Sequence, residues 1–240
     1  MTLRITYGLL AMLAFSGCAD RSTTSQEMVQ STAKEVIESG EGFVLRVSPE
    51  FDDLVSADAV IEKLADGFGF TEGPHWIEYH GLYGGAVLFS DIPGNQIVLW
   101  SSDHSISSFL TPVFEGDHDG SDGFLDPRGF IGPNGITTDA EGRVTFAEHG
   151  NRRISRIEPD GSRTVVVDAY EGNRLNSPND LIFHSDGSLY FTDPPYGLSQ
   201  QDDDPAKELA MNGIYRFATD GRLDLLATQT RPNGLAFSPD

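Results

Sequence analysis

A short phrase that carries a side-chain amide returns three times in this chain of 240 residues. It reads Pro-Asn-Gly at 133–135, Pro-Asn-Asp at 178–180 and Pro-Asn-Gly at 232–234, and a related Glu-Gly-Pro stands at 72–74. Amide and carboxylate oxygens are hard ligands, and a cation such as calcium accepts several of them. One copy alone would indicate a turn, because Asn and Gly tolerate unusual backbone angles. Recurrence instead favours one shared site made by Glu72, Asn134, Asn179 and Asn233.

The segments between these phrases have the alternating pattern of short β-strands. Strands are predicted in 86–93, 95–103 and 106–111, and comparable runs follow Pro133 and Pro178. The turns between them carry Asp-Gly or Glu-Gly, which is typical of hairpins. Units of four strands and roughly 40–50 residues are typical of β-propeller blades. The chain is therefore predicted to be all-β.

In a propeller, the first strand of each blade lines a central channel. The repeated phrases open such strands, so we expect Asn134, Asn179 and Asn233 to converge near one mouth of the channel, with Glu72 beside them. A simple alignment on proline, however, puts His75 rather than Glu72 opposite the asparagines. Asn134 is the least supported of the three as a cation ligand and is a candidate substrate contact.

From Gly67 onward the chain supplies about three blades and, at 231–240, the first strand of a fourth. A propeller closes with about 4–8 blades. We therefore interpret the chain as a C-terminally truncated piece, expected to be unstable or inactive alone. A strand at 59–65 is expected to complete the absent last blade, and so to lack its partners in this chain.

Two further residues follow predicted strands. His149, in EHGNRR, is either a substrate contact or a structural hydrogen-bonding residue. Asp193 precedes two prolines and is a candidate catalytic carboxylate; contacting the substrate, orienting Asn179 and capping the turn are the alternatives. Arg152 and Arg153 are predicted to lie on a solvated outer strand.

Several functional classes find no support in the sequence. There is no Gly-x-Ser-x-Gly nucleophile elbow, and no zinc pattern of the His-Glu-x-x-His or Cys-x-x-Cys type. The formal net charge of −21 argues against nucleic acid and anionic membrane surfaces as partners.

The N-terminus has the pattern of an export signal. A sparse basic start and a short apolar run lead to FSGC, which resembles a bacterial lipobox with Cys18 as the lipidated residue. We expect a lipoprotein-type signal at 1–18, a flexible polar tether at 19–42 and the partial propeller at 43–240. The expected location is the bacterial cell envelope or periplasm, with a lipid at Cys18 as the only membrane contact.

From about residue 43 to its end, the chain resembles the family of gluconolactonase, senescence marker protein and luciferin-regenerating enzyme. The resemblance rests on FTEGPHW (70–76), GPNGITTDAEGR (132–143), RLNSPNDLIFHSDGSLYFTDPPYGL (174–198) and RPNGLAFSPD (231–240). It implies a six-bladed propeller holding a divalent cation, usually Ca²⁺, with Zn²⁺, Mg²⁺ or Mn²⁺ as alternatives.

The resemblance also implies a hydrolase that opens a sugar lactone, a small neutral substrate. It assigns cation ligands to Glu72, Asn179 and Asn233, with Asn179 a substrate contact in some members; the family's main catalytic Asp would lie beyond residue 240. Ser177 stands where one branch has a substrate-binding arginine, so that contact is in doubt. Two alternatives stay open: a propeller that only binds a ligand or protein, and a phosphotriesterase-like hydrolase.

Overall fold

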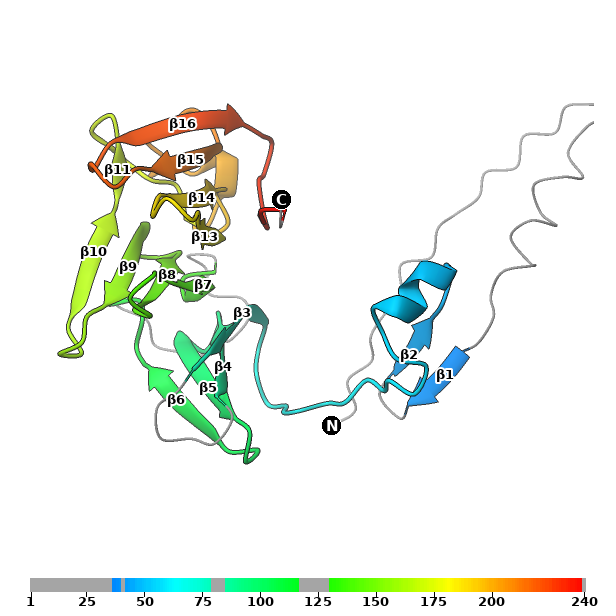
Figure 1. The fold of residues 1–240 in the computed structure, drawn as a ribbon. Helices are drawn as coiled ribbons and strands as arrows, with labels where there is room; N and C mark the ends of the chain where they lie inside the picture. The colour runs from blue at the N-terminus through cyan, green and yellow to red at the C-terminus, as the bar shows by residue number, and fades with distance from the viewer. Residues whose placement is uncertain (1–35, 40–41, 79–84, 117–129, 239–240) are drawn as a thin grey trace, which may run out of the picture. The chain divides into compact units, whose positions relative to one another are not determined.

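The computed structural model describes residues 36–39, 42–78, 85–116 and 130–238 (Figure 1). Contacts divide the chain into two compact units, Met1–Leu64 and Ala65–Asp240. The predicted signal at 1–18, including Cys18, lies outside the described residues. No helix within the described ranges is long and apolar enough to cross a bilayer.

In the first unit, a small hairpin is followed by a single helical turn. Strands β1 (Val36–Ser39) and β2 (Gly42–Leu45) pair antiparallel, and the 3-10 helix η1 (Pro49–Asp53) follows. The buried Arg46 guanidinium donates to Asp52 Oδ1 at 2.7 Å and to the Val55 carbonyl at 2.8 Å. The hairpin begins inside the range predicted as a tether. Residues 59–65 form no ladder with any described segment, as expected for a strand without its predicted partners, and the strand itself stays a prediction.

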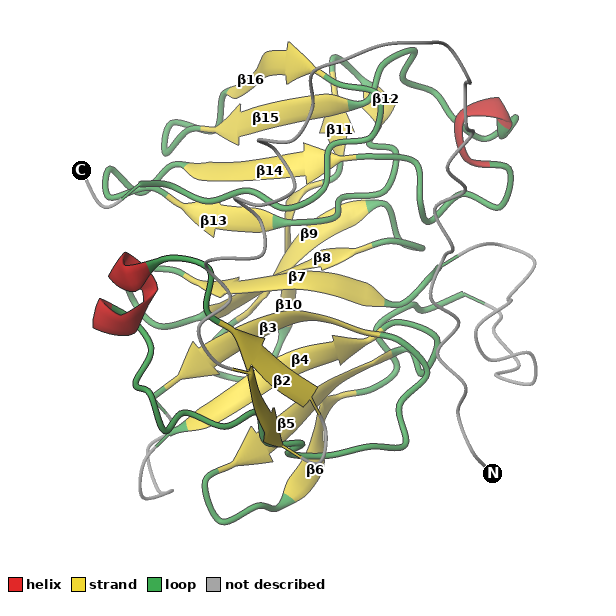
Figure 2. Ribbon diagram, turned by 90° about the vertical axis from the view of Figure 1, so that its right-hand side faces the viewer, coloured by secondary structure: helices red, strands yellow, loops and turns green. Residues whose placement is uncertain are grey.

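The second unit contains three sheets of four antiparallel strands, each strand paired with the next along the chain (Figure 2). Sheet 1 comprises β3 (Thr71–Ile77), β4 (Ala86–Asp91), β5 (Gln96–Ser101) and β6 (Ile106–Leu110). Sheet 2 comprises β7 (Pro133–Thr138), β8 (Val144–Glu148), β9 (Arg153–Ile157) and β10 (Arg163–Val167). Sheet 3 comprises β13 (Leu181–Phe183), β14 (Leu189–Asp193), β15 (Gly213–Phe217) and β16 (Leu223–Thr228).

Short elements join the second and third sheets. Strands β11 (Ala169–Tyr170) and β12 (Asn173–Arg174) form a hairpin that the sequence pattern did not predict. A single 3-10 turn, η3 (Gln201–Asp203), lies within sheet 3, between β14 and β15. The predicted first strand of a fourth blade is not assigned: residues 231–238 have no strand pairing among the described residues. The all-β prediction and its three sets of four strands are confirmed.

Two apolar clusters join the sheets face to face. The first packs Leu88 and Ile97 of sheet 1 against Ile136 and Phe146 of sheet 2, all buried. The second includes Ala147, the neighbour of Phe146 on β8, packed with the interior of sheet 3. Successive residues of a strand point to opposite faces, so β8 contributes to both clusters. This packing sets β3 beside β7 and β7 beside β13.

Candidate metal and substrate site

Strand register shows which residues are equivalent in the first two sheets. In sheet 1, Thr71 pairs with Asp91, the last residue of β4; in sheet 2, Pro133 pairs with Glu148, the last residue of β8. Glu72 and Asn134 each follow directly. One extra residue on the first strand then interrupts both ladders at the same point. Glu72 therefore occupies the position of Asn134.

The sequence alignment on proline, which put His75 opposite the asparagines, is therefore wrong at this position. This residue pairs with Leu88, three positions beyond Glu72 along β3. Its Nε2 lies 3.1 Å from Thr138 Oγ1, at the far end of β7 from Asn134. His75 thus joins the first two sheets and does not belong with the asparagines.

Close backbone contacts line up the four predicted oxygen donors, which we call the oxygen row (Glu72, Asn134, Asn179, Asn233). A Cβ on Gly73 would lie 2.2 Å from the Asn134 carbonyl oxygen, and one on Gly135 would lie 2.7 Å from that of Asn179. The row continues through Asp180, whose Oδ2 accepts from Leu235 N at 2.9 Å. Each of the first three members, Glu72, Asn134 and Asn179, is thus followed by a residue that contacts the next strand or segment.

Hydrogen bonds to backbone carbonyls hold the same residues. Ser90 Oγ donates to the carbonyl oxygen of Asn134 at 2.6 Å. Thr192 Oγ1, at the equivalent end of β14, donates to that of Asn233 at 2.8 Å. The Gly135 amide donates to that of Asn179 at 2.7 Å. Because the carbonyls accept these bonds, the row is held without use of its side-chain oxygens.

The side chain of Asn134 is oriented by His149. Both residues are buried, and Asn134 Nδ2 lies 3.2 Å from His149 Nε2. His149 Nδ1 lies 3.0 Å from the Phe130 carbonyl, which can only accept, so Nδ1 carries the proton. Burial lowers the pKa of His149 to about 4, so the ring is neutral and Nε2 accepts from Asn134. This bond turns Asn134 Oδ1 away from the histidine.

The other side chains of the oxygen row keep their polar atoms available. Within the described residues, Glu72, Asn179 and Asn233 have no side-chain hydrogen bond or ion pair, although Asn179 is only 4% exposed. Buried amides are normally hydrogen-bonded, so the Asn179 side chain is available to bind a ligand or a water. One carboxylate with neutral amide oxygens suits a hard divalent cation. The row itself has one carboxylate, and nowhere in the described ranges is a group of three or more His, Cys, Asp or Glu side chains placed to hold a metal.

Asp193 lies apart from this row, in the interior of sheet 3. Its carboxylate is fully buried; Oδ2 accepts from Asn176 N and Oδ1 from Ser177 N, both at 2.7 Å. Desolvation raises its pKa to about 7, against the lowering effect of the two amides. Both oxygens are therefore occupied by the segment that leads to Asn179. This arrangement favours the orienting and capping alternatives over direct attack on a substrate.

Arg152 is the residue that the sequence pattern placed wrongly. It is only 4% exposed, not solvated, and its backbone adopts a left-handed conformation with φ of 59°. The turn after β8 forces this geometry, since Arg152 N bonds to the Glu148 carbonyl at 2.9 Å. Arg153 is half-buried beside the Glu148 carboxylate, with Nε 3.2 Å from Oε2. Gly150-Asn151 marks a turn in the sequence, but nothing in the local pattern shows that the arginine after it is buried.

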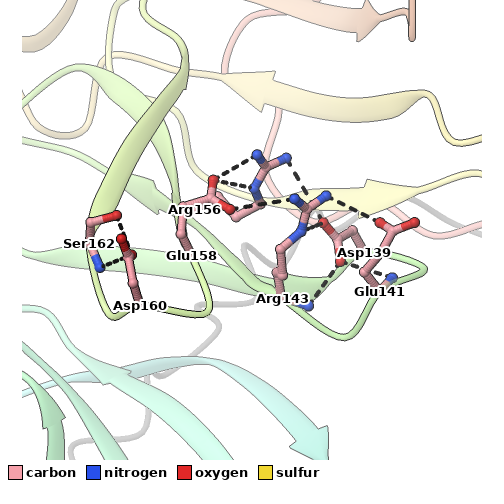
Figure 3. Close-up of polar contacts among 7 residues, drawn as sticks. All are labelled: Asp139, Glu141, Arg143, Arg156, Glu158, Asp160 and Ser162. Carbon is pink, nitrogen blue, oxygen red and sulfur yellow. Dashed lines mark hydrogen bonds and ion pairs between the residues drawn. The ribbon is translucent and has the colours of Figure 1, made fainter.

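A groove of about 850 Å³ lies between sheets 2 and 3, at the opposite end of β7 and β13 from the oxygen row. Arg143 and Arg156 are in its wall, and Figure 3 shows both guanidinium groups surrounded by acids. Arg143 Nε donates to Asp139 at 2.7 Å, and Arg156 Nη2 donates to Glu158 at 2.7 Å. Since these cations are already neutralised, the groove offers no anion site.

Comparison with known proteins identifies the family of the chain. Residues 70–240 match the model of the SMP-30/gluconolactonase/LRE-like region. The chain belongs to this family. A gluconolactonase of Zymomonas mobilis is 41% identical over 201 residues, which are 83% of this chain and 54% of that protein.

Two solved structures resemble this chain in fold as well as in sequence. A presumed gluconolactonase superposes with a TM-score of 0.64 at 36% identity, covering 80% of this chain and 60% of the other. A gluconolactonase of Xanthomonas campestris superposes with a TM-score of 0.59 at 35% identity, covering 73% and 53%. The chain thus spans a little over half the length of these relatives, and its fold is of the propeller type.

Proposed function

We propose that the protein carrying this chain is a gluconolactonase-type hydrolase that opens a sugar lactone with the help of a divalent cation. The oxygen row carries this proposal, because three of its four side chains have no described protein partner while their backbone is firmly held. Family membership and the similarity to gluconolactonases support the same reaction class. The proposed substrate is a small neutral lactone, and Ca²⁺ is the proposed cation.

The residues of the oxygen row would have different roles in binding the cation and the substrate. Glu72 would supply negative charge to the cation, and Asn179 and Asn233 would add neutral oxygens. When bound, the cation polarises the lactone carbonyl and stabilises charge on its oxygen. Asn134, oriented by His149, presents Oδ1 as an acceptor for a sugar hydroxyl. Water adds at the carbonyl carbon, the ring C–O bond breaks, and a hydroxy acid forms.

The first prediction concerns Glu72. Glu72→Gln removes the only carboxylate of the row and should weaken Ca²⁺ binding at least about tenfold, measured by titration calorimetry. Lactone hydrolysis by the unmodified protein should stop when a chelator is added and resume with Ca²⁺. Glu141→Gln is the matched control, because Glu141 is exposed and lies in the Arg143 cluster at the far end of β7.

Three outcomes would oppose the proposal. Lactone hydrolysis that ignores the chelator would overturn the role of the cation, as would unchanged Ca²⁺ affinity in Glu72→Gln. Turnover of a phosphotriester without turnover of lactones would favour the alternative hydrolase. Ligand binding with no turnover of either would favour a propeller that only binds.

A further inference from the structure

We propose that Arg152 is a positioning residue for Asn179, acting from sheet 2 through the backbone of residues 174–177. The inference deepens the proposed function, since it concerns how one member of the oxygen row is held. Arg152 does not belong to the row, and it touches neither Asn179 nor any other donor in it.

The guanidinium of Arg152 holds the carbonyl side of this segment. Nε donates to the Leu175 carbonyl at 2.7 Å, and Nη2 is 3.4 Å from that of Arg174. Nη1 donates to the Ala206 carbonyl at 2.7 Å and lies 3.7 Å from Glu208 Oε1. The buried guanidinium thereby joins the turn after β8 to two segments, one before β13 (Arg174 and Leu175) and one after β14 (Ala206).

The amide side of the same segment is held by Asp193. Its two oxygens accept from consecutive amides, Asn176 and Ser177, as described above. Ser177 Oγ in turn accepts from Gly197 N at 2.7 Å. The segment is thus fixed on its carbonyl side from sheet 2 and on its amide side from sheet 3. Asn179 follows two residues later, so its placement depends on both.

Sheet 1 uses the equivalent position in the same way. Asn95 stands four residues after Asp91, as Arg152 stands four after Glu148, and it too has a left-handed backbone, with φ of 52°. Its Oδ1 accepts from Phe114 N at 2.7 Å, in the segment that leads toward sheet 2. The residue at this turn therefore joins its sheet to the connection that follows, and Arg152 does so immediately before Asn179.

Arginine suits this role better than lysine. Its planar fork can bind several carbonyls at once and stays charged when buried, whereas lysine offers a single point charge. Arg152→Lys therefore keeps the charge but loses the simultaneous bonds to Leu175 and Ala206. Residues that orient ligands typically change metal affinity about 10- to 100-fold when substituted, and we expect a loss in this range.

The test measures three quantities on the protein carrying the whole chain, at pH 8: thermal stability, Ca²⁺ affinity, and hydrogen exchange of the Asn176 and Ser177 amides without Ca²⁺. Arg152→Lys should accelerate exchange at both amides and weaken Ca²⁺ binding. Arg143→Lys is the matched control, since Arg143 is an equally paired arginine of sheet 2 near the opposite end (Figure 3). It should lower stability without affecting exchange or affinity.

The outcomes separate this inference from the proposed function. If Arg152→Lys lowers stability but leaves exchange and Ca²⁺ affinity unchanged, or if Arg143→Lys causes the same losses, the positioning role is overturned. If the unmodified protein binds no Ca²⁺ and opens no lactone, the proposed function fails. Amide exchange at Asn176 and Ser177 then tests by itself whether Arg152 positions the segment before Asn179. Should Arg152→Lys not fold, Arg152→Gln, which keeps a single amide donor, replaces it; faster exchange at Asn176 supports the inference, and unchanged exchange opposes it.

Discussion

At the scale of single residues, burial decides the chemistry of the two candidate titratable groups. His149 is neutral because it is enclosed, and it uses both ring nitrogens to hold Phe130 and Asn134. Asp193 is enclosed as well and uses both oxygens on backbone amides. Each residue is thus better described as a support for the oxygen row than as a group that reacts.

The raised pKa of Asp193 predicts a pH-dependent stability. Desolvation raises this pKa from 3.8 to about 7, so the folded state binds a proton more tightly than the unfolded chain. The contribution of Asp193 is therefore fully present below about pH 4 and declines as pH rises to 7. Urea unfolding of the unmodified protein and of Asp193→Asn should show the difference in their free energies of unfolding falling across this window. A difference that rises or stays flat would contradict the assignment.

At the scale of elements, the close approach of the first strands explains why glycine follows the donors Glu72 and Asn134. Gly73 has a left-handed backbone with φ of 57°, and its Cα faces the Asn134 carbonyl. Gly135 is similarly close to Asn179. A side chain at either position would push neighbouring strands apart. The glycines therefore permit the contact that aligns the row.

Gly73→Ala should test this contact against a matched position. Gly142 also has a left-handed backbone, with φ of 76°, but a Cβ there would meet nothing within 4 Å. Gly142→Ala should cost only the backbone strain, about 1–2 kcal/mol. Gly73→Ala should cost at least about 1 kcal/mol more, because it adds overpacking between β3 and β7. Urea unfolding measures both, and equal losses would show that the close approach is not tight.

At the scale of the whole molecule, the dominant electrostatic feature is the net charge of −21. Such an excess of one sign destabilises the compact state through self-repulsion. The ion pairs at Arg143 and Arg156 offset it only locally.

Monovalent salt should therefore stabilise this protein. Raising NaCl from about 10 mM to 150 mM shortens the screening length from about 30 Å to 8 Å, which weakens the repulsion between carboxylates. Thermal unfolding with a chelator present, so that no divalent cation contributes, should give a melting temperature that rises with salt. KCl should act as NaCl does. A melting temperature that falls with both salts would show that favourable ion pairs outweigh the repulsion.

Local pattern was sufficient for much of this protein. Alternating apolar residues and Asp-Gly turns are properties of neighbouring residues, so the strands and hairpins of all three sheets could be predicted. The recurring Pro-Asn phrase likewise marked three of the oxygen donors, and the family pattern marked Glu72. Local pattern cannot establish the strand predicted at 59–65, because a strand exists only with a partner and no described segment pairs with it.

Tertiary structure alone decided which of these residues meet. The bulge that places Glu72, not His75, level with Asn134 exists only in the strand register. The burial of Arg152 depends on carbonyls 22 to 54 residues away, which no local pattern can indicate. The environment of Asp193 follows from desolvation and from amides 16 and 17 residues earlier. Sequence determined the residue types and the strands, while long-range packing determined their environment, because hydrogen bonding and solvent exclusion act between segments distant in the chain.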